Sequence, residues 1–396
     1  MEEKKISLYI HIPYCISKCR YCDFFSQACG KLPVPDSYVD ALCYEISFIF
    51  ESRKDTAFVD TVYVGGGTPS LLSKGQISKL FSVLNKVCRF TSDVEITFEV
   101  NPDDVSEELL CALEAAGVNR VSCGIQSMTE KVLQYAGRRA SAEVNQQALN
   151  LLQKFWHKKL SLDLICALPY ETKESFAKSL DAVIDTKPDH ISMYSLTIED
   201  KTPFGVALEN GSLSYDFEAA DAMWLYGRDY LENHGYPQYE VSNFAAENNR
   251  CRHNLVYWKH GNYLGAGSGA TGTTYNKDGT GLRLTNTSDI KKYIDYWTSA
   301  PRWLNGCEAA VPNPPQNSEI LDLTTSKFEF FMMSLRKTDG FTEAEYKACF
   351  DEELPISFTE TFNRWKQKGL AEQTSEGRYY LNHQGILFLN SFLSEL

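Results

Sequence analysis

The chain has 396 residues, of which 43% are hydrophobic and 23% charged, and its formal net charge is −13 at pH 7. This length can bury a large core and predicts two domains, and the composition is typical of a globular protein. The acidic balance argues against nucleic acid as a partner, because contacts to phosphates need clustered Lys and Arg. No apolar run is long enough to span a bilayer, so we expect no transmembrane segment.

The N-terminus and the cysteines bear on where the protein works. Met1–Lys5 contains two acids and leads into a strand pattern, whereas a signal peptide needs a basic start and an apolar helix. Twelve cysteines in a chain with no expected export signal predict reduced thiols and a cytoplasmic protein.

The N-terminal half alternates short β-branched runs with amphipathic helical stretches. The expected strands are Ser7–Pro13, Thr61–Val64, Glu95–Val100, Arg120–Gly124, Leu160–Cys166 and His190–Ser195. The expected helices between them are Asp36–Phe50, Gly75–Val87, Ser106–Ala116, Glu143–Phe155 and Lys173–Asp185. Repeated βα units predict an α/β fold with a parallel sheet and right-handed crossovers. Six units fit a partial barrel as well as an open sheet.

The second half of the chain is less regular. From about Gly205 to Ala300 one plain helix is expected, Phe217–Asn233. A Pro- and Asn-rich run, Val311–Asn317, reads as a linker. We therefore expect a barrel with its C-terminal extension at residues 1–300, a linker at 301–317 and a separate C-terminal domain at 318–396.

The C-terminal domain is predicted to be a small α+β unit. Helical patterns at Thr325–Leu335, Thr342–Phe350 and Thr359–Lys368 precede an extended pair, Gly369–Gln373 and Tyr379–Leu381. Three helices followed by a hairpin are typical of a winged-helix-like domain. DNA binding is the usual role of that shape, but the acidic chain favours a packing or lid role.

Three cysteines lie close together after the first expected strand. Cys15, Cys19 and Cys22 have the spacing C-x₃-C-x₂-C, in a loop where parallel α/β proteins place their chemistry. Thiolates suit iron–sulfur clusters or zinc, and three of them on a four-iron cluster leave one iron open. The alternative is a zinc site completed by Cys29 or His11. The short loop and the lack of a second C-x₂-C pair favour the cluster.

Further candidate residues follow other strands. Gly65-Gly66-Gly67-Thr68-Pro69 comes directly after the second strand, where glycines allow a ligand to approach the backbone closely. Polar side chains at later strand ends are Glu99, Gln126, Arg138 and Asp163. Asp163 lies within an apolar strand, and a buried acid needs partners. On a barrel, all of these residues would share one open face.

These motifs resemble those of the radical-SAM superfamily, whose cluster motif is C-x₃-C-x-aromatic-C. Tyr21 fills the aromatic position, which packs against adenine in that family. The resemblance implies a partial (β/α)6 TIM-like barrel, a [4Fe–4S] cluster on the three cysteines, and S-adenosylmethionine (SAM) at the open iron. The glycine motif resembles the one that contacts the methionine amino group. We therefore expect a side chain at Gly66 or Gly67 to block SAM while the cluster still assembles.

Over nearly the whole chain, the sequence is similar to the coproporphyrinogen dehydrogenase (HemN) branch of that superfamily. The similarity rests on Tyr9-Ile10-His11-Ile12-Pro13, the glycine motif, Asp163 and the segment Phe328–Gly340. It implies that SAM is contacted by Tyr9, Gly66, Gly67, Thr68, Glu99, Gln126, Arg138 and Asp163.

Two features separate the chain from the dehydrogenases themselves. Phe24 occupies the position of their fourth cysteine, and His253-Asn254-Leu255-Val256-Tyr257-Trp258 fits an H-N-x-x-Y-W motif. Both resemble the HemW haem chaperones, which implies that His253 ligates haem iron while Tyr257 and Trp258 stack on the porphyrin. From the residues alone, a satisfied buried histidine and core aromatics are the alternative.

The resemblance implies a haem chaperone that passes haem to haemoproteins, such as respiratory enzymes, and lacks coproporphyrinogen dehydrogenase activity. The rival hypothesis is a radical-SAM enzyme that decarboxylates coproporphyrinogen III oxidatively or performs radical chemistry on haem. Phe24 favours the chaperone. A third hypothesis is an α/β scaffold stabilised by zinc.

Overall fold

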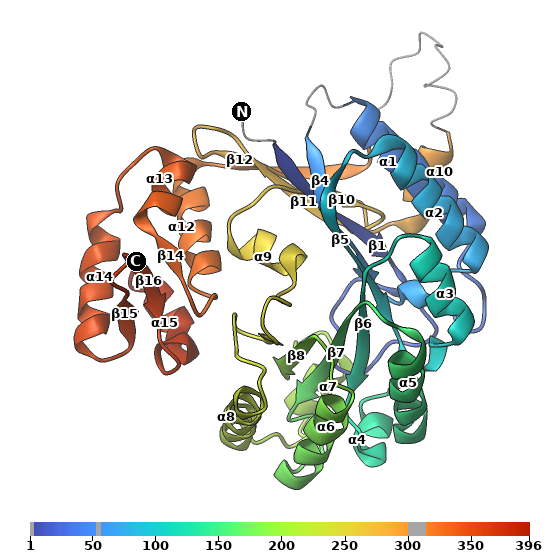
Figure 1. The fold of residues 1–396 in the computed structure, drawn as a ribbon, viewed down its shortest axis with the longest axis horizontal. Coiled ribbons are helices and arrows are strands. Elements are labelled where there is room, and N and C mark those ends of the chain that lie inside the picture. Colours follow the sequence, from blue (N-terminus) through green and yellow to red (C-terminus); the bar gives the residue numbers. More distant parts are fainter. Residues whose placement is uncertain (1–3, 53–56, 300–313) are drawn as a thin grey trace.

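A curved sheet with helices on its outer face forms the larger part of the molecule (Figure 1). The computed structural model describes residues 4–52, 57–299 and 314–396. Six parallel strands lie at the centre of the sheet: β1 (Lys5–Ile12), β4 (Phe58–Gly66), β5 (Phe90–Val100), β6 (Arg120–Gln126), β7 (Lys159–Cys166) and β8 (His190–Ser195). They confirm all six predicted strands and the expected barrel class.

Helices connect these strands and cover the outside of the sheet. They are α1 (Asp36–Ser52), α2 (Lys74–Val87), α3 (Glu107–Ala115), α4 (Glu130–Tyr135), α5 (Ala142–Phe155) and α6 (Lys173–Asp185). The side chain of Ser106 accepts a hydrogen bond from the amide of Leu109 at 3.2 Å, so it caps the N-terminus of α3. A capping box at Ser73 and Gln76 starts α2 in the same way.

The central strands alternate apolar and polar residues, although parallel strands covered on both faces usually read as continuous apolar runs. Leu8, Val62 and Phe98 are fully buried and belong to the main hydrophobic core. The intervening positions carry polar side chains that hydrogen-bond to one another within the barrel, such as Ser122 with Asp163. This polar interior builds the candidate site.

The region predicted to be irregular instead extends the sheet, so that prediction is wrong. β10 (Tyr263–Ala266) pairs parallel to β1, and the following strands add antiparallel at that edge: β11 (Thr271–Tyr275), β12 (Gly281–Asn286) and β13 (Gln316–Leu321). β9 (Asn243–Ala245) pairs with β8 at the other edge. The helices of this region are α7 (Pro203–Glu209), α8 (Phe217–Asn233), α9 (Arg252–Trp258) and α10 (Ile290–Thr298). The bounds of α8 are those predicted.

The predicted linker falls mostly on residues 300–313, which lie outside the described residues. β13 crosses the expected boundary at residue 318 and pairs with β12, so this stretch is part of the sheet. The division into two domains otherwise stays a prediction.

The C-terminal unit has a separate hydrophobic core made largely of aromatic side chains, among them Phe331, Phe341 and Phe358. Its elements are α12 (Leu323–Ser334), β14 (Phe341–Thr342), α13 (Glu343–Phe350), α14 (Ile356–Gln367), β15 (Ala371–Gln373), β16 (Arg378–Leu381) and α15 (Leu389–Leu393). Three helices and a hairpin appear in the predicted order, and β14 adds a third strand. Among the helices of the described residues, none is long and apolar enough to cross a membrane.

Candidate cofactor site at the carboxyl end of the barrel

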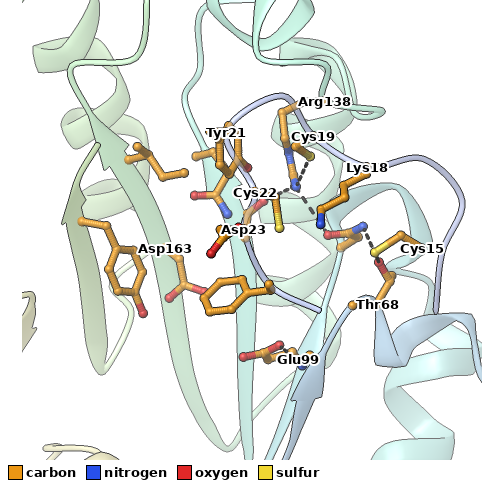
Figure 2. Close-up of a pocket in the computed structure, with 18 of the residues that line it drawn as sticks. Cys15, Lys18, Cys19, Tyr21, Cys22, Asp23, Thr68, Glu99, Arg138 and Asp163 are labelled. Atoms are coloured by element: carbon orange, nitrogen blue, oxygen red, sulfur yellow. Dashed lines mark hydrogen bonds between the residues drawn. The ribbon is translucent and has the colours of Figure 1, made fainter. Parts of the chain in front are cut away.

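A cavity of about 500 Å³ lies at the carboxyl ends of the barrel strands (Figure 2). This volume falls within the range of small-molecule pockets, roughly 300–1,000 Å³. Its lining includes these predicted site residues: Cys15, Cys19, Tyr21, Cys22, Gly66, Gly67, Thr68, Glu99, Gln126, Arg138 and Asp163. Residues that are far apart in the sequence therefore meet in one cavity, as parallel strands require.

The three motif cysteines lie in the segment that follows β1, and Cys15 ends the two-residue strand β2 (Tyr14–Cys15) (Figure 2). The hydroxyl of Thr68 donates to Cys15 Sγ at 3.4 Å, and Arg138 Nη1 lies 3.8 Å from Cys19 Sγ. Burial raises the pKa of the Cys22 thiol. Donors beside two of the sulfurs stabilise negative charge there, which a thiolate ligand needs.

The geometry fits a cluster better than a single zinc ion. In the described part of the chain, no three His, Cys, Asp or Glu side chains converge closely enough to hold one ion. In a zinc site each sulfur lies about 2.3 Å from the one zinc ion, so the sulfurs lie close to one another. A four-iron cluster is larger and spaces its sulfur ligands further apart. His11 is also engaged, because Tyr9 OH donates to Nδ1 at 2.8 Å and Nε2 donates to the carbonyl of Phe25 at 2.9 Å.

The glycine motif at the end of β4 is shaped by close contacts within the protein. Gly66 has φ +116°, and a Cβ there would lie 2.5 Å from the ring of His11. A Cβ on Gly67 would lie 2.6 Å from the carbonyl oxygen of Tyr14. A side chain at either position would therefore displace the support of the cluster loop. These contacts argue against the expectation that such a change would block SAM alone.

Two partly buried carboxyl groups face the cavity. Glu99 accepts hydrogen bonds from Tyr63 OH at 2.7 Å and from the amide of Gly66 at 3.2 Å, and burial raises its pKa to about 7. Asp163 accepts from Ser122 at 3.0 Å and from Ser161 at 3.3 Å, and burial raises its pKa to about 6. Their environment disfavours the ionised forms, so a cationic ligand would be bound with release of protons.

Arg138 and Gln126 add polar groups with unused bonding capacity. Arg138 Nη2 donates to the carbonyl of Gly124 at 2.6 Å. Within the described residues, Arg138 Nε and Gln126 Oε1 are buried without a hydrogen-bond partner. Gln126 also has φ +67°, a strained conformation that tends to occur at functional sites. Buried unpaired polar atoms beside a cavity suit a polar ligand such as SAM.

Tyr9 stands apart from the other predicted SAM residues. It does not line the cavity, and its hydroxyl bonds to His11, so it supports the strand beneath the site. Sequence reasoning missed Tyr63, Ser122 and Ser161, which hold the two carboxylates. The signal that could have found them is the alternation of polar and apolar residues along β4, β6 and β7.

The His253–Trp258 segment lies in α9 and does not line the cavity. His253 is 1% exposed, with Nδ1 2.6 Å from Thr61 Oγ1 and Nε2 2.8 Å from Tyr257 OH. Both ring nitrogens are engaged, so neither is free for iron in this conformation. The alternative interpretation, a satisfied buried histidine, describes what the structure shows. Trp258 is half-buried, and the guanidinium of Arg336 lies 5.3 Å from its ring centroid.

Comparisons with known proteins show the family of the chain. The model of the radical SAM superfamily matches residues 9–183. The haem chaperone HemW of Bacillus subtilis is 33% identical over 98% of this chain and 100% of its own length. HemW of Haemophilus influenzae is 38% identical over 98% of this chain and 97% of its own length. The chain belongs to the HemW family of the radical SAM superfamily. The cavity of this HemW-family chain is lined by residues of both the cluster motif and the glycine motif.

A solved structure supports the fold of this HemW-family chain. The coproporphyrinogen III oxidase HemN of Escherichia coli, described as a radical SAM enzyme, covers 99% of this chain and 90% of its own. The TM-score is 0.78 and the identity 22%, so the likeness concerns the fold.

Proposed function

We propose that this chain is a haem chaperone that binds haem and delivers it to haem-accepting proteins, with respiratory enzymes as candidate acceptors. The observation that carries the proposal is similarity over nearly the full length to relatives named haem chaperone HemW. Phe24 supports it, because this exposed side chain occupies the position of the fourth cysteine of the dehydrogenases. The free thiols of the described cysteines favour the cytoplasm as its location.

In this proposal Cys15, Cys19 and Cys22 hold a [4Fe–4S] cluster beside the cavity. The cluster supplies electron-transfer chemistry when it is bound. Thr68 and Arg138 hydrogen-bond to its sulfur ligands, which stabilises their negative charge.

The rest of the cavity binds SAM. Glu99 and Asp163 accept hydrogen bonds from its polar groups and offset its positive charge. Gln126 Oε1 offers an acceptor that no described group uses. Tyr21 presents an aromatic ring at the cavity wall for the adenine.

Haem is proposed to bind at the His253–Trp258 segment. This requires His253 to exchange its bond with Tyr257 for iron. Trp258 supports the assignment, since its Nε1 is buried with no partner among the described residues, and Arg336 beside it can pair with a propionate.

Two variants test the haem ligand. In Tyr257→Phe, Nε2 of His253 loses its partner and becomes available, so haem affinity should be retained or raised and the Soret band unchanged. In His253→Ala, the Soret band should change or haem affinity should fall by at least tenfold. An unchanged spectrum and affinity in His253→Ala would assign haem to another ligand.

Product analysis tests the function. Cluster-loaded protein is incubated anaerobically with SAM, a low-potential reductant and either haem or coproporphyrinogen III. We expect haem to bind and to move to an apo-haemoprotein, with no porphyrin product. Protoporphyrinogen formed over many turnovers would instead establish the rival, a radical-SAM enzyme of porphyrin metabolism.

A further inference from the structure

A chain of buried hydrogen bonds crosses the barrel interior from the cofactor cavity to α9. Ser161 Oγ bonds to Asp163 Oδ1 at 3.3 Å and to His190 Nδ1 at 2.8 Å. His190 Nε2 then bonds to Tyr239 OH at 2.9 Å. Tyr239 OH finally accepts from the backbone amide of Cys251, the N-cap of α9, at 3.2 Å. The four residues after Asp163 are at most 3% exposed, so water does not interrupt the chain.

The direction of every bond follows from its two ends. The Cys251 amide can only donate, and an ionised Asp163 can only accept, so the single hydroxyl proton of Ser161 points to Asp163. Ser161 must then accept from His190, which places the ring proton on Nδ1. Because burial lowers the pKa of His190 and keeps it neutral, Nε2 accepts from Tyr239. All donors point toward the cavity.

A second arrangement exists and is less favourable. A proton on Asp163 would let Ser161 turn toward His190 and move the ring proton to Nε2. Nε2–H and the Cys251 amide would then both donate to the oxygen of Tyr239, and the hydroxyl proton of Tyr239 would lose the acceptor it has in the described structure. The charged and titratable groups facing the chain are Arg138, Glu99, Tyr63, Tyr194 and Cys123 near Asp163, Arg120 near His190, and Glu240, Cys251 and Arg250 near Tyr239.

The far end of the chain meets a helix that is anchored to the barrel. Glu95 Oε1 accepts from the amides of Arg252 at 2.8 Å and His253 at 3.1 Å, and its other oxygen pairs with Arg120. The first turn of α9 is therefore held by Glu95 of β5 and by Tyr239 of the segment between α8 and β9. A change in either one alters the start of the segment that carries His253.

We propose that Ser161, His190 and Tyr239 are positioning residues that couple the occupant of the cofactor cavity to the conformation of α9. A ligand hydroxyl that donates to Asp163 favours its ionised form. This holds the chain in the direction in which the Tyr239 hydroxyl donates to His190 and its oxygen accepts from the Cys251 amide alone. The inference rests on the proposed SAM site, and its link to haem rests on the proposed haem segment. The coupling itself can be measured without haem.

Hydrogen exchange under argon on the cluster-loaded protein tests the coupling. At about pH 5, where burial keeps Asp163 mostly protonated without a ligand, saturating SAM should slow exchange in the peptide that spans residues 250–258 by about fivefold or more, the range typical of coupled sites. Tyr239→Phe should abolish this response while SAM affinity stays within about twofold of wild type. Ser161→Ala breaks the other end of the chain and should give the same loss.

Tyr236→Phe is the matched control. Tyr236 is a buried tyrosine of the same segment, and its hydroxyl donates to the carbonyl of Pro188 outside the chain. It should respond to SAM as wild type does. A response in Tyr239→Phe and Ser161→Ala equal to that of Tyr236→Phe would overturn the proposal, as would unchanged exchange in wild type that binds SAM.

The tautomer of His190 separates this inference from the proposed function. Nitrogen NMR of SAM-free protein at pH 8, assigned with His190→Gln, should show the proton on Nδ1. A proton on Nε2 would overturn the proposed direction even if SAM and haem both bind. Failure of wild type to bind SAM, with the proton on Nδ1, would contradict the proposed cofactor site and leave the hydrogen-bond chain supported.

Discussion

Glu99 and Asp163 show how single residues prepare the cavity for a cation. Burial raises the pKa of Glu99 to about 7 and that of Asp163 to about 6. For Glu99 the folded-state pKa exceeds the ordinary value of 4.5, so its contribution to the free energy of unfolding is largest below that value and is lost as pH rises to about 7. A positive ligand reverses this preference, because the ionised carboxyls then have a partner.

SAM affinity is expected to fall as pH is lowered from 8 to about 5.5, because first Glu99 and then Asp163 takes up a proton. Each lost charge-assisted hydrogen bond should cost roughly 1.5–3 kcal/mol. Calorimetry in two buffers of different ionisation enthalpy should also detect proton release near pH 6.5. Glu99→Gln should remove the upper part of this pH dependence. Equal affinity across the range would show that neither carboxyl meets the ligand.

Replacing Cys15, Cys19 or Cys22 with Ala is expected to abolish the cluster, because each supplies one of three thiolates. Cys29→Ala is the control, since its sulfur lies on the same loop but not on the cavity wall. Iron content and visible absorbance after anaerobic reconstitution measure the outcome. Equal loss in the Cys29 variant would point to a four-cysteine site.

At the scale of elements, the loop after β4 and the loop after β1 depend on each other. The amide of Gly67 donates to the carbonyl of Ile12 at 2.8 Å, and its Cα faces the backbone of Tyr14. Tyr14 directly precedes the first cluster cysteine. The glycine motif therefore serves the cluster loop as well as the ligand.

Gly67→Ala is expected to lower cluster content and stability together, since a Cβ would overlap the Tyr14 carbonyl. Overpacking of this kind typically costs about 1–3 kcal/mol. Gly75→Ala in α2 is the control, because its nearest contact would be 3.9 Å away, and it should be neutral or stabilising by about 1 kcal/mol. Chemical denaturation and iron content measure both. Full cluster loading with lost SAM binding in Gly67→Ala would show that the added side chain blocks SAM alone.

At the scale of the whole molecule, partly buried polar contacts join the barrel sheet to the C-terminal unit. One guanidinium nitrogen of Arg283 on β12, Nη2, donates to both carboxylate oxygens of Glu329 on α12, at 2.8 and 2.7 Å. His260 Nε2 bonds to Ser326 Oγ at 3.1 Å beside it, and its ring stacks on Tyr275. These contacts place the C-terminal unit beside α9, so that docking and the proposed haem segment share one region (Figure 1).

Glu329→Ala is expected to weaken docking of the C-terminal unit by about 1.5–3 kcal/mol. The reason is that Arg283 would lose its two charge-assisted bonds to the Glu329 carboxylate. Glu352→Ala removes the more exposed pair with Lys327 and should cost at most about 1 kcal/mol. Hydrogen exchange in α12 and limited proteolysis measure docking. Identical behaviour of the two variants would show that the Arg283 pair does not hold the interface.

Local patterns in the sequence determined the repeated βα units, the bounds of α8 and many of the residues that line the cavity. Each of these depends on spacing along the chain: apolar periodicity for elements, and residues at strand ends for the site. Parallel strands bring such ends together whatever the details of packing, so Cys15, Glu99 and Asp163 could be grouped from the sequence alone.

Tertiary structure alone decided what depends on partners distant in sequence. β10 to β13 are short and rich in Gly, Thr and Asn, so they have little apolar periodicity, and pairing at the edge of β1 makes them strands. His253 fits a ligand motif in the sequence, yet its bonds to Thr61 and Tyr257 make it a buried, satisfied side chain. The chain from Asp163 to Cys251 likewise has no local signal, because each of its bonds except the first joins residues from different parts of the chain.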